Sequence, residues 1–153
     1  MTFEPGEADA MSNSIAKRTI SAETVTRLIA AAEAKSRELK KAMCIAVTNE
    51  AGHLRGFLAM DGAPHLSIQI AQDKAYTASS FGIATHVWYD FIKNDPPLLH
   101  GITHTPRLTI FGGGYPVMDE GQMVGAIGVS GGHYTDDMEV ARAALEAIGA
   151  PVT

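Results

Sequence analysis

The alternation of short apolar runs with tight turns is the feature of this sequence that most constrains its fold. Five runs are of strand length: residues 43–48, 53–60, 107–111, a brief run ending at Met118, and 122–130. The turns at 49–52 and 119–121 each join two consecutive runs, which indicates a β-hairpin and therefore antiparallel pairing. Helical patterns lie before, between and after these groups. We therefore predict an α+β fold, in which helices pack on a five-stranded antiparallel sheet.

Helical periodicity and capping residues place the helices. Ser21 is a suitable N-cap, and Val25 and Leu28 follow at the spacing of one helical face. Further helical patterns cover residues 64–80, 85–93 and 135–148, with one or two turns within 98–105. The length of 153 residues suits one domain. We expect this domain over residues 19–150, behind a flexible N-terminal tail of residues 1–18.

Composition and charge exclude several classes of protein. Twelve Lys and Arg residues against seventeen Asp and Glu residues give a net charge of −5. The chain therefore lacks the basic surface of a nucleic-acid-binding protein or of a membrane-surface helix. Cys44 is the only cysteine, which rules out an internal disulfide and a zinc site built from several cysteines. The acidic N-terminus does not resemble a secretion signal, and no apolar stretch is long enough to cross a membrane. We therefore expect a cytoplasmic protein.

Glycines gather at two places where the backbone could meet a ligand. The two sets are Gly112, Gly113 and Gly114 with the following Tyr115, and Ser130, Gly131 and Gly132 before the last predicted helix. The first set either exposes amide groups to an anion or forms a hairpin turn with unusual torsions. The second set could bind an anion at the helix N-terminus, unless Asp136 and Asp137 cap the same amides. Neither set has the spacing of a dinucleotide-binding or P-loop motif.

A histidine-bearing segment precedes the third predicted strand. His100 and His104 are four residues apart, so in a helix they would share one face and could bind a divalent metal. Alternatively, one of them acts as a general base near neutral pH. Arg107 follows and could hold a substrate carboxylate in a bidentate contact. The plainer alternative is that both histidines are surface loop residues.

Two further residues have both a functional and a structural interpretation. Lys74 lies in a helix of otherwise small and apolar residues. It could meet an anion at the floor of a pocket, be exposed, or pair with an aspartate inside the fold. His86 lies two residues from Trp88 and could ligate a flat cofactor, although such a histidine more often belongs to a helix face. Cys44 lies in an apolar run and is expected to be buried rather than nucleophilic.

Several of these segments together resemble the GlcG/HbpS family, which includes the C-terminal domain of PduO-type proteins. The segments are residues 49–54 (NEAGHL), 60–64 (MDGAP), 73–77 (DKAYT), 111–116 (FGGGYP) and 125–132 (GAIGVSGG). The resemblance covers residues 19–149. It implies a profilin-like domain with a five-stranded antiparallel sheet, assembly into dimers or larger oligomers and, in some members, haem binding. It assigns no haem ligand to a residue of this chain.

These features lead to two functional hypotheses. The first is a cytoplasmic catabolic enzyme that acts on a small carboxylate-bearing substrate, as a hydrolase such as a lactonase or as a proton-transfer isomerase. His104 or His100 would be the base. Arg107 and Lys74 would hold the carboxylate, and glycine amides would stabilise an oxyanion. The alternative is a haem- or tetrapyrrole-binding protein without turnover, with a histidine as axial ligand.

The cofactor and the assembly follow from the same reasoning. Haem and a divalent metal are the two cofactor candidates, the metal through His100 and His104. The expected partner is a small anionic molecule, with neither nucleic acid nor membrane. We also expect a homo-oligomer with closed symmetry, because the family resemblance and the apolar strand 122–130 suggest that subunits meet.

Overall fold

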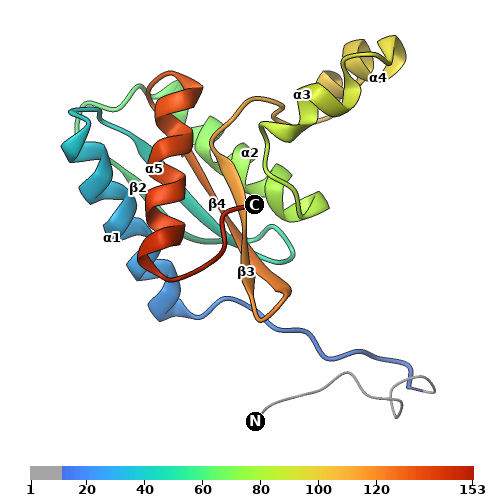
Figure 1. Ribbon diagram of the computed structural model, residues 1–153, viewed down its shortest axis with the longest axis horizontal. Helices are drawn as coiled ribbons and strands as arrows, with labels where there is room; N and C mark the ends of the chain where they lie inside the picture. Colours follow the sequence, from blue (N-terminus) through green and yellow to red (C-terminus); the bar gives the residue numbers. More distant parts are fainter. Residues whose placement is uncertain (1–11) are drawn as a thin grey trace.

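The computed structural model describes residues 12–153, and residues 1–11 of the predicted tail lie outside this part. The elements follow in the order α1 (Ala22–Glu38), β1 (Cys44–Asn49), β2 (Leu54–Ala59), α2 (Leu66–Phe81), α3 (Val87–Ile92), α4 (Pro96–Gly101), the 3-10 helix η2 (Ile102–His104), β3 (Gly114–Asp119), β4 (Gln122–Ser130) and α5 (Tyr134–Ala147). Figure 1 shows a sheet between helices, with α3 and α4 standing out from the body. None of the helices in the described part is long and apolar enough to cross a membrane.

The sheet confirms the α+β class and the antiparallel pairing, but within residues 12–153 it has four strands, in the order β2-β1-β4-β3. The prediction of a fifth strand at residues 107–111 is wrong. Arg107 has a left-handed backbone, with φ of 66°, which interrupts an extended run. The Thr77 hydroxyl of α2 donates to the Arg107 carbonyl at 2.9 Å and accepts the Thr109 amide at 3.0 Å. The segment therefore bonds to a helix side chain rather than to a neighbouring strand.

Alternate residues of β1 face two different layers of the protein. Ile45 and Val47 are buried in a large core that includes residues of α1 and α5. Cys44 and Ala46 point to the opposite face, where they are buried against the alanines of α2. This helix approaches closely because β4 has a glycine beneath it: a Cβ on Gly128 would collide with the Ala71 carbonyl oxygen. The close approach places the helix that carries Lys74 directly on the sheet.

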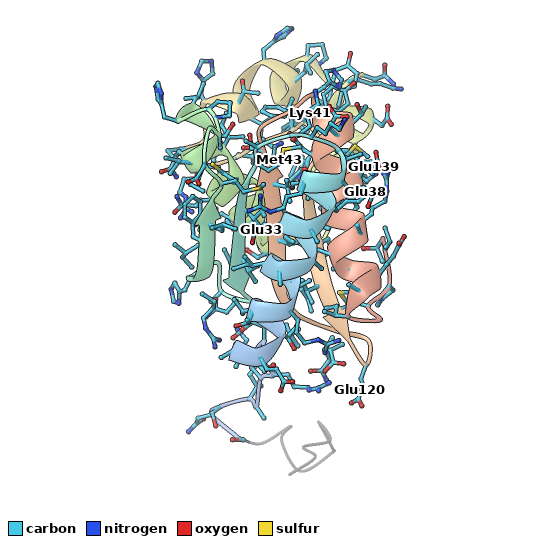
Figure 2. The ribbon with its side chains drawn as sticks, turned by 90° about the vertical axis from the view of Figure 1, so that its left-hand side faces the viewer. Glu33, Glu38, Lys41, Met43, Glu120 and Glu139 are labelled. Atoms are coloured by element: carbon cyan, nitrogen blue, oxygen red, sulfur yellow. The ribbon has the colours of Figure 1, made fainter. Side chains whose placement is uncertain are left out.

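Helices α1 and α5 lie side by side on the other face of the sheet (Figure 2). The predicted cap of α1 is confirmed, since the Ser21 hydroxyl accepts the Thr24 amide at 3.1 Å. Lys35 connects the two helices: its Nζ lies 3.1 Å from Glu38 on α1 and 3.5 Å from Glu139 on α5. Packing against α1 and the ion pair between Lys35 and Glu139 hold α5 in place. The first turn of α5 borders the candidate site.

Helices α3 and α4 and the short η2 form an arm that follows α2 (Figure 1). Asp95 caps α4 by accepting the Leu98 amide at 3.4 Å, and Pro96 suits the first position of the helix. Trp88 and Ile92 of α3 are buried, whereas no residue of α4 is. The arm is therefore fixed at α3 and exposed beyond it.

Candidate functional site

A cavity of about 380 Å³ opens where the arm meets the body. Three segments form it: the start of α3, the stretch before β3 and the first residue of α5. The lining residues are His86, Tyr89, Asp90, Ile110, Phe111, Gly112 and Tyr134. Most of this surface is apolar and aromatic, with few polar groups. Its volume and lining are typical of a small-molecule pocket.

His86 has the most unusual surroundings in this cavity. Its Nδ1 atom is buried without a hydrogen-bond partner among residues 12–153. Burial lowers the pKa of the imidazole, and the positive charge of Arg142 adds to this effect, while Asp90 opposes it. The ring is therefore neutral at neutral pH and keeps an unprotonated nitrogen. A neutral imidazole is the form of histidine that ligates a metal.

The glycine turn before β3 forms the wall beside His86 because it carries no side chains. A Cβ on Gly112 would collide with Met138 of α5 and would come within 3.4 Å of the His86 Cβ. Gly113 has φ of +124°, and a Cβ there would lie 2.6 Å from the Val129 carbonyl oxygen. Only glycine lets the backbone enter this space, so the turn is packed on both sides.

Lys74 and Asp137 form a buried ion pair next to this turn. The Lys74 Nζ lies 2.8 Å from the Asp137 Oδ2, with the two side chains 0% and 3% exposed. Burial lowers the pKa of Lys74 and raises the pKa of Asp137, and the attraction between them opposes both changes. The same Nζ lies 5.0 Å from the centre of the Phe111 ring. Of the interpretations given for Lys74, the structure matches the internal pair.

The other glycine set is held by the protein itself. The Gly132 amide donates to the Asp137 Oδ1 at 3.0 Å, so this carboxylate caps the amide that an anion would need. Ser130 hydrogen-bonds to Ser67 at 3.1 Å and is buried. Tyr115 is buried in the core, with its ring 5.6 Å from that of His86. None of these residues lines the cavity.

The structure does not bring His100, His104 and Arg107 into the cavity. Both histidines are exposed, one on α4 and one on η2. Arg107 lines a separate cavity of about 90 Å³ and its Nε donates to Asp73 at 3.1 Å. In the described part of the chain, no three His, Cys, Asp or Glu side chains gather as a metal-binding group. A ligand role for these three residues stays a prediction.

Sequence reasoning missed Asp137 as the partner of Lys74 and Tyr134 as a cavity wall. A lysine among small apolar residues signals that a buried acid must meet it. The acid lies 63 residues away, and several aspartates could have served. Tyr134 carries no motif, and only the fold brings it to His86.

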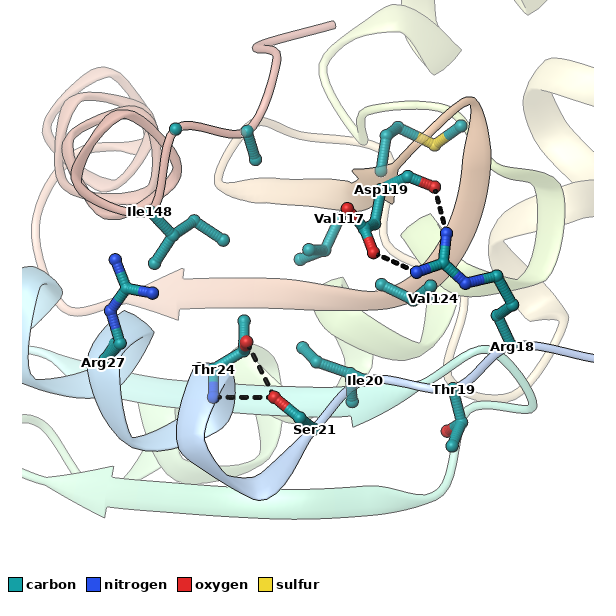
Figure 3. Close-up of a pocket in the computed structure, with 13 residues that line it drawn as sticks. Arg18, Thr19, Ile20, Ser21, Thr24, Arg27, Val117, Asp119, Val124 and Ile148 are labelled. Atoms are coloured by element: carbon teal, nitrogen blue, oxygen red, sulfur yellow. Dashed lines mark hydrogen bonds and ion pairs between the residues drawn. The ribbon is translucent and has the colours of Figure 1, made fainter. Parts of the chain in front are cut away.

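A second cavity, of about 360 Å³, lies where the C-terminal end of α5 faces the start of α1 (Figure 3). Its lining is mainly polar. The Arg18 Nη2 lies 2.6 Å from the Asp119 carboxylate, and the Ser21 hydroxyl donates to Thr24 at 2.8 Å. Because these polar groups engage one another, this cavity is less suited to a flat apolar ligand than the cavity at His86.

Comparison with known proteins identifies the family to which this fold belongs. The family model described as "Haem degrading protein HbpS-like" matches residues 20–146. The chain belongs to the HbpS-like family. The GlcG/HbpS resemblance of its motifs is thereby confirmed.

The relatives include proteins of this length and solved structures. The 15.0 kDa protein of the dhaT–dhaS intergenic region of Citrobacter freundii is 35% identical over 130 residues, which cover 84% of this chain and 91% of that protein. The PduOC–haem complex is 29% identical with a TM-score of 0.81, and the match covers 87% of this chain and 97% of that one. A double mutant of HbpS from Streptomyces reticuli is 27% identical with a TM-score of 0.81, and the match covers 90% of this chain and 92% of that one.

These comparisons correct the leading functional hypothesis. The description of the family names haem degradation, and one of the similar structures is a haem complex. The prediction of a catabolic hydrolase, lactonase or isomerase acting on a carboxylate substrate is therefore wrong. The haem-binding alternative agrees better with the HbpS-like relatives.

Proposed function

We propose that this protein binds haem in the cavity at His86, with the His86 imidazole as a ligand to the iron. The observation that carries the proposal is a neutral, partly buried imidazole on the wall of an aromatic cavity. His86 would hold the haem through its iron, and haem would supply an iron that takes a nitrogen ligand. The haem complex of a structural relative supports the same class of ligand.

The residues of the cavity fit a flat, largely apolar group. Tyr89, Phe111 and Tyr134 are exposed aromatic residues around one opening, so a porphyrin would remove apolar surface from water. His86 lines the same opening, so a neutral imidazole stands beside the space that a porphyrin would fill. Haem is also a small anionic molecule through its propionates, which agrees with the predicted charge of the ligand.

We also propose that the protein is a homo-oligomer, with the arm as the contact surface. Strand β4 pairs with β1 and β3 on its two sides, so it offers no free edge to a second subunit. The arm and the end of α2 instead expose Phe81, Tyr89 and Phe91, of which Phe91 is 73% exposed. Exposed aromatic groups that gather on one surface indicate a protein contact.

A titration with ferric haem, followed by visible absorption, tests the haem proposal. The wild-type protein is expected to give a saturable change of the Soret band at one haem per chain. Tyr134→Asp places a charge at the cavity wall and is expected to weaken binding about ten-fold or more, which corresponds to about 1.4 kcal/mol. Arg27→Gln, in the second cavity, is the matched control and should bind as wild type. A wild-type spectrum identical to that of free haem would refute the proposal.

A further inference from the structure

The Lys74–Asp137 pair joins three elements that meet behind the cavity. Lys74 comes from α2, and its Nζ donates to the Val129 carbonyl of β4 at 2.9 Å. Asp137 comes from the first turn of α5 and uses both oxygens: Oδ2 accepts Lys74 at 2.8 Å, and Oδ1 accepts the Gly132 amide at 3.0 Å. Neither residue lines the cavity itself. The pair can therefore act on a ligand only through the residues that it holds.

The glycine turn rests directly on this pair. A Cβ on Gly113 would lie 2.8 Å from the Lys74 Nζ and 3.0 Å from the Asp137 Cβ. The Gly113 carbonyl accepts the Val129 amide at 2.9 Å, which ties the turn to the same residue that Lys74 binds. The Lys74 ammonium also faces the Phe111 ring. The position of the turn thus depends on where the ammonium and the carboxylate lie.

The other side of the same turn contacts the proposed iron ligand. Gly112 fits between Met138 and His86, and a Cβ there would displace the Met138 side chain. Met138 directly follows Asp137 on α5, so the ion pair and this contact belong to one helical turn. A continuous set of contacts therefore runs from the pair through Gly113 and Gly112 to His86.

We infer that the Lys74–Asp137 pair is the positioning element of the cavity, which holds Phe111 and Gly112 against His86 so that the aromatic wall and the imidazole keep one separation. The identity of the ligand rests on the proposed haem function, whereas the positioning of the wall does not.

Stability alone does not account for such a pair. Two charges lose their hydration when they are buried, and an apolar pair of similar shape is often as stable or more stable. Removing one partner is different, because it leaves the other charge buried and unpaired. An apolar double substitution therefore separates the two roles: it can restore stability, but it cannot restore the hydrogen bonds to Val129 and Gly132.

The test compares the double variant Lys74→Met/Asp137→Leu with wild type. Fluorophenylalanine labelling and ¹⁹F NMR report the surroundings of Phe111 without any ligand, and Phe111→Leu assigns its signal. Haem titration of the same samples measures how tightly the cavity binds its proposed ligand. Glu33→Gln/Arg37→Gln is the matched control, because it removes an exposed ion pair of 2.7 Å on α1.

We expect the double variant to unfold cooperatively, to show a broadened Phe111 signal from a ring that is no longer held in one place, and to bind haem at least ten-fold more weakly than wild type and control; a shift without broadening follows from losing the ammonium 5.0 Å away. A folded double variant with the wild-type Phe111 signal and haem affinity would overturn the inference. If that variant does not fold, Lys74→Gln/Asp137→Asn replaces it, because this neutral pair leaves neither charge buried alone; an unchanged Phe111 signal there would also overturn the inference. If wild type binds no haem, the proposed function fails, and the Phe111 signal alone decides the role of the pair.

Discussion

The guanidinium carbon of Arg107 lies 3.9 Å from the centre of the Tyr76 ring, while its Nε donates to Asp73 at 3.1 Å. Both partners are on α2, so one side chain fastens the segment before β3 to that helix. The cation–π contact and the ion pair offset the unfavourable left-handed backbone of Arg107. Together with the two Thr77 hydrogen bonds, this contact holds the segment on α2.

Removing this side chain should lower stability. Arg107→Ala is expected to reduce the free energy of unfolding by about 1 kcal/mol, a modest value because the group is partly exposed. Arg107→Lys should fall between wild type and Ala, since an ammonium keeps the charge near Asp73 but lacks the planar group over Tyr76. Urea unfolding measures both, with Arg37→Ala on the exposed face of α1 as control. Equal stability of Arg107→Ala and wild type would show that the contact does not form in solution.

Gly113 should tolerate no side chain. A Cβ there would lie 2.6 Å from the Val129 carbonyl oxygen, on a backbone with φ of +124°. Gly113→Ala is expected to cost about 3 kcal/mol or more, from overpacking and backbone strain together. Gly121→Ala is the control, because Gly121 has φ of +79° but nothing within 4 Å of its Cβ position. Gly121→Ala should lower the free energy of unfolding by only about 1 kcal/mol. Similar losses of stability in the two variants would contradict a closely packed turn at Gly113.

His86 should make stability depend on pH in a defined direction. Its pKa is lowered in the folded protein, mainly by burial. As the pH falls through about 6.5, the unfolded chain takes up a proton that the folded protein does not, so stability decreases. Above that pH the contribution is complete and constant. His86→Gln should therefore flatten the loss of stability between pH 7 and pH 5 in urea unfolding. Parallel wild-type and variant curves over that range would rule out the buried, neutral imidazole.

The arm should carry the contact between subunits. Light scattering at micromolar concentration is expected to give a multiple of the single-chain mass for wild type. Phe91→Glu places a charge at the most exposed aromatic side chain of α3 and should shift the population to monomers. Leu54→Glu, at an exposed position of β2, is the matched control and should stay oligomeric. If wild type is a monomer, or if Phe91→Glu stays oligomeric, the arm is not the interface between subunits.

Local patterns predicted the framework of the fold well. Ser21 caps α1 as expected, and the turns that join β1 to β2 and β3 to β4 lie where the sequence placed them. These features depend on residues that are close in sequence. The third helical pattern was placed from residue 85, whereas α3 begins at Val87, because the Thr85 hydroxyl instead accepts the Gly114 amide.

The site was harder to predict because its contacts are distant in sequence. The glycine turn and Lys74 were recognised as candidates, but the acid that meets Lys74 lies 63 residues away. His100 and His104 stood out through their spacing, yet α4 carries no buried residue that would bring them to a cavity. His86 has no motif, and its significance comes from burial that only the fold creates.

The most direct test of the haem proposal is the absorption spectrum of haem with His86→Ala, measured with and without added imidazole. We expect wild type to give a Soret band typical of histidine ligation and His86→Ala to lose it. Free imidazole should restore the band by entering the space of the missing ring. His104→Ala, on the exposed arm, should keep the wild-type spectrum. A wild-type spectrum in His86→Ala, or a loss of the band in His104→Ala instead, would contradict the assignment of His86 as the iron ligand.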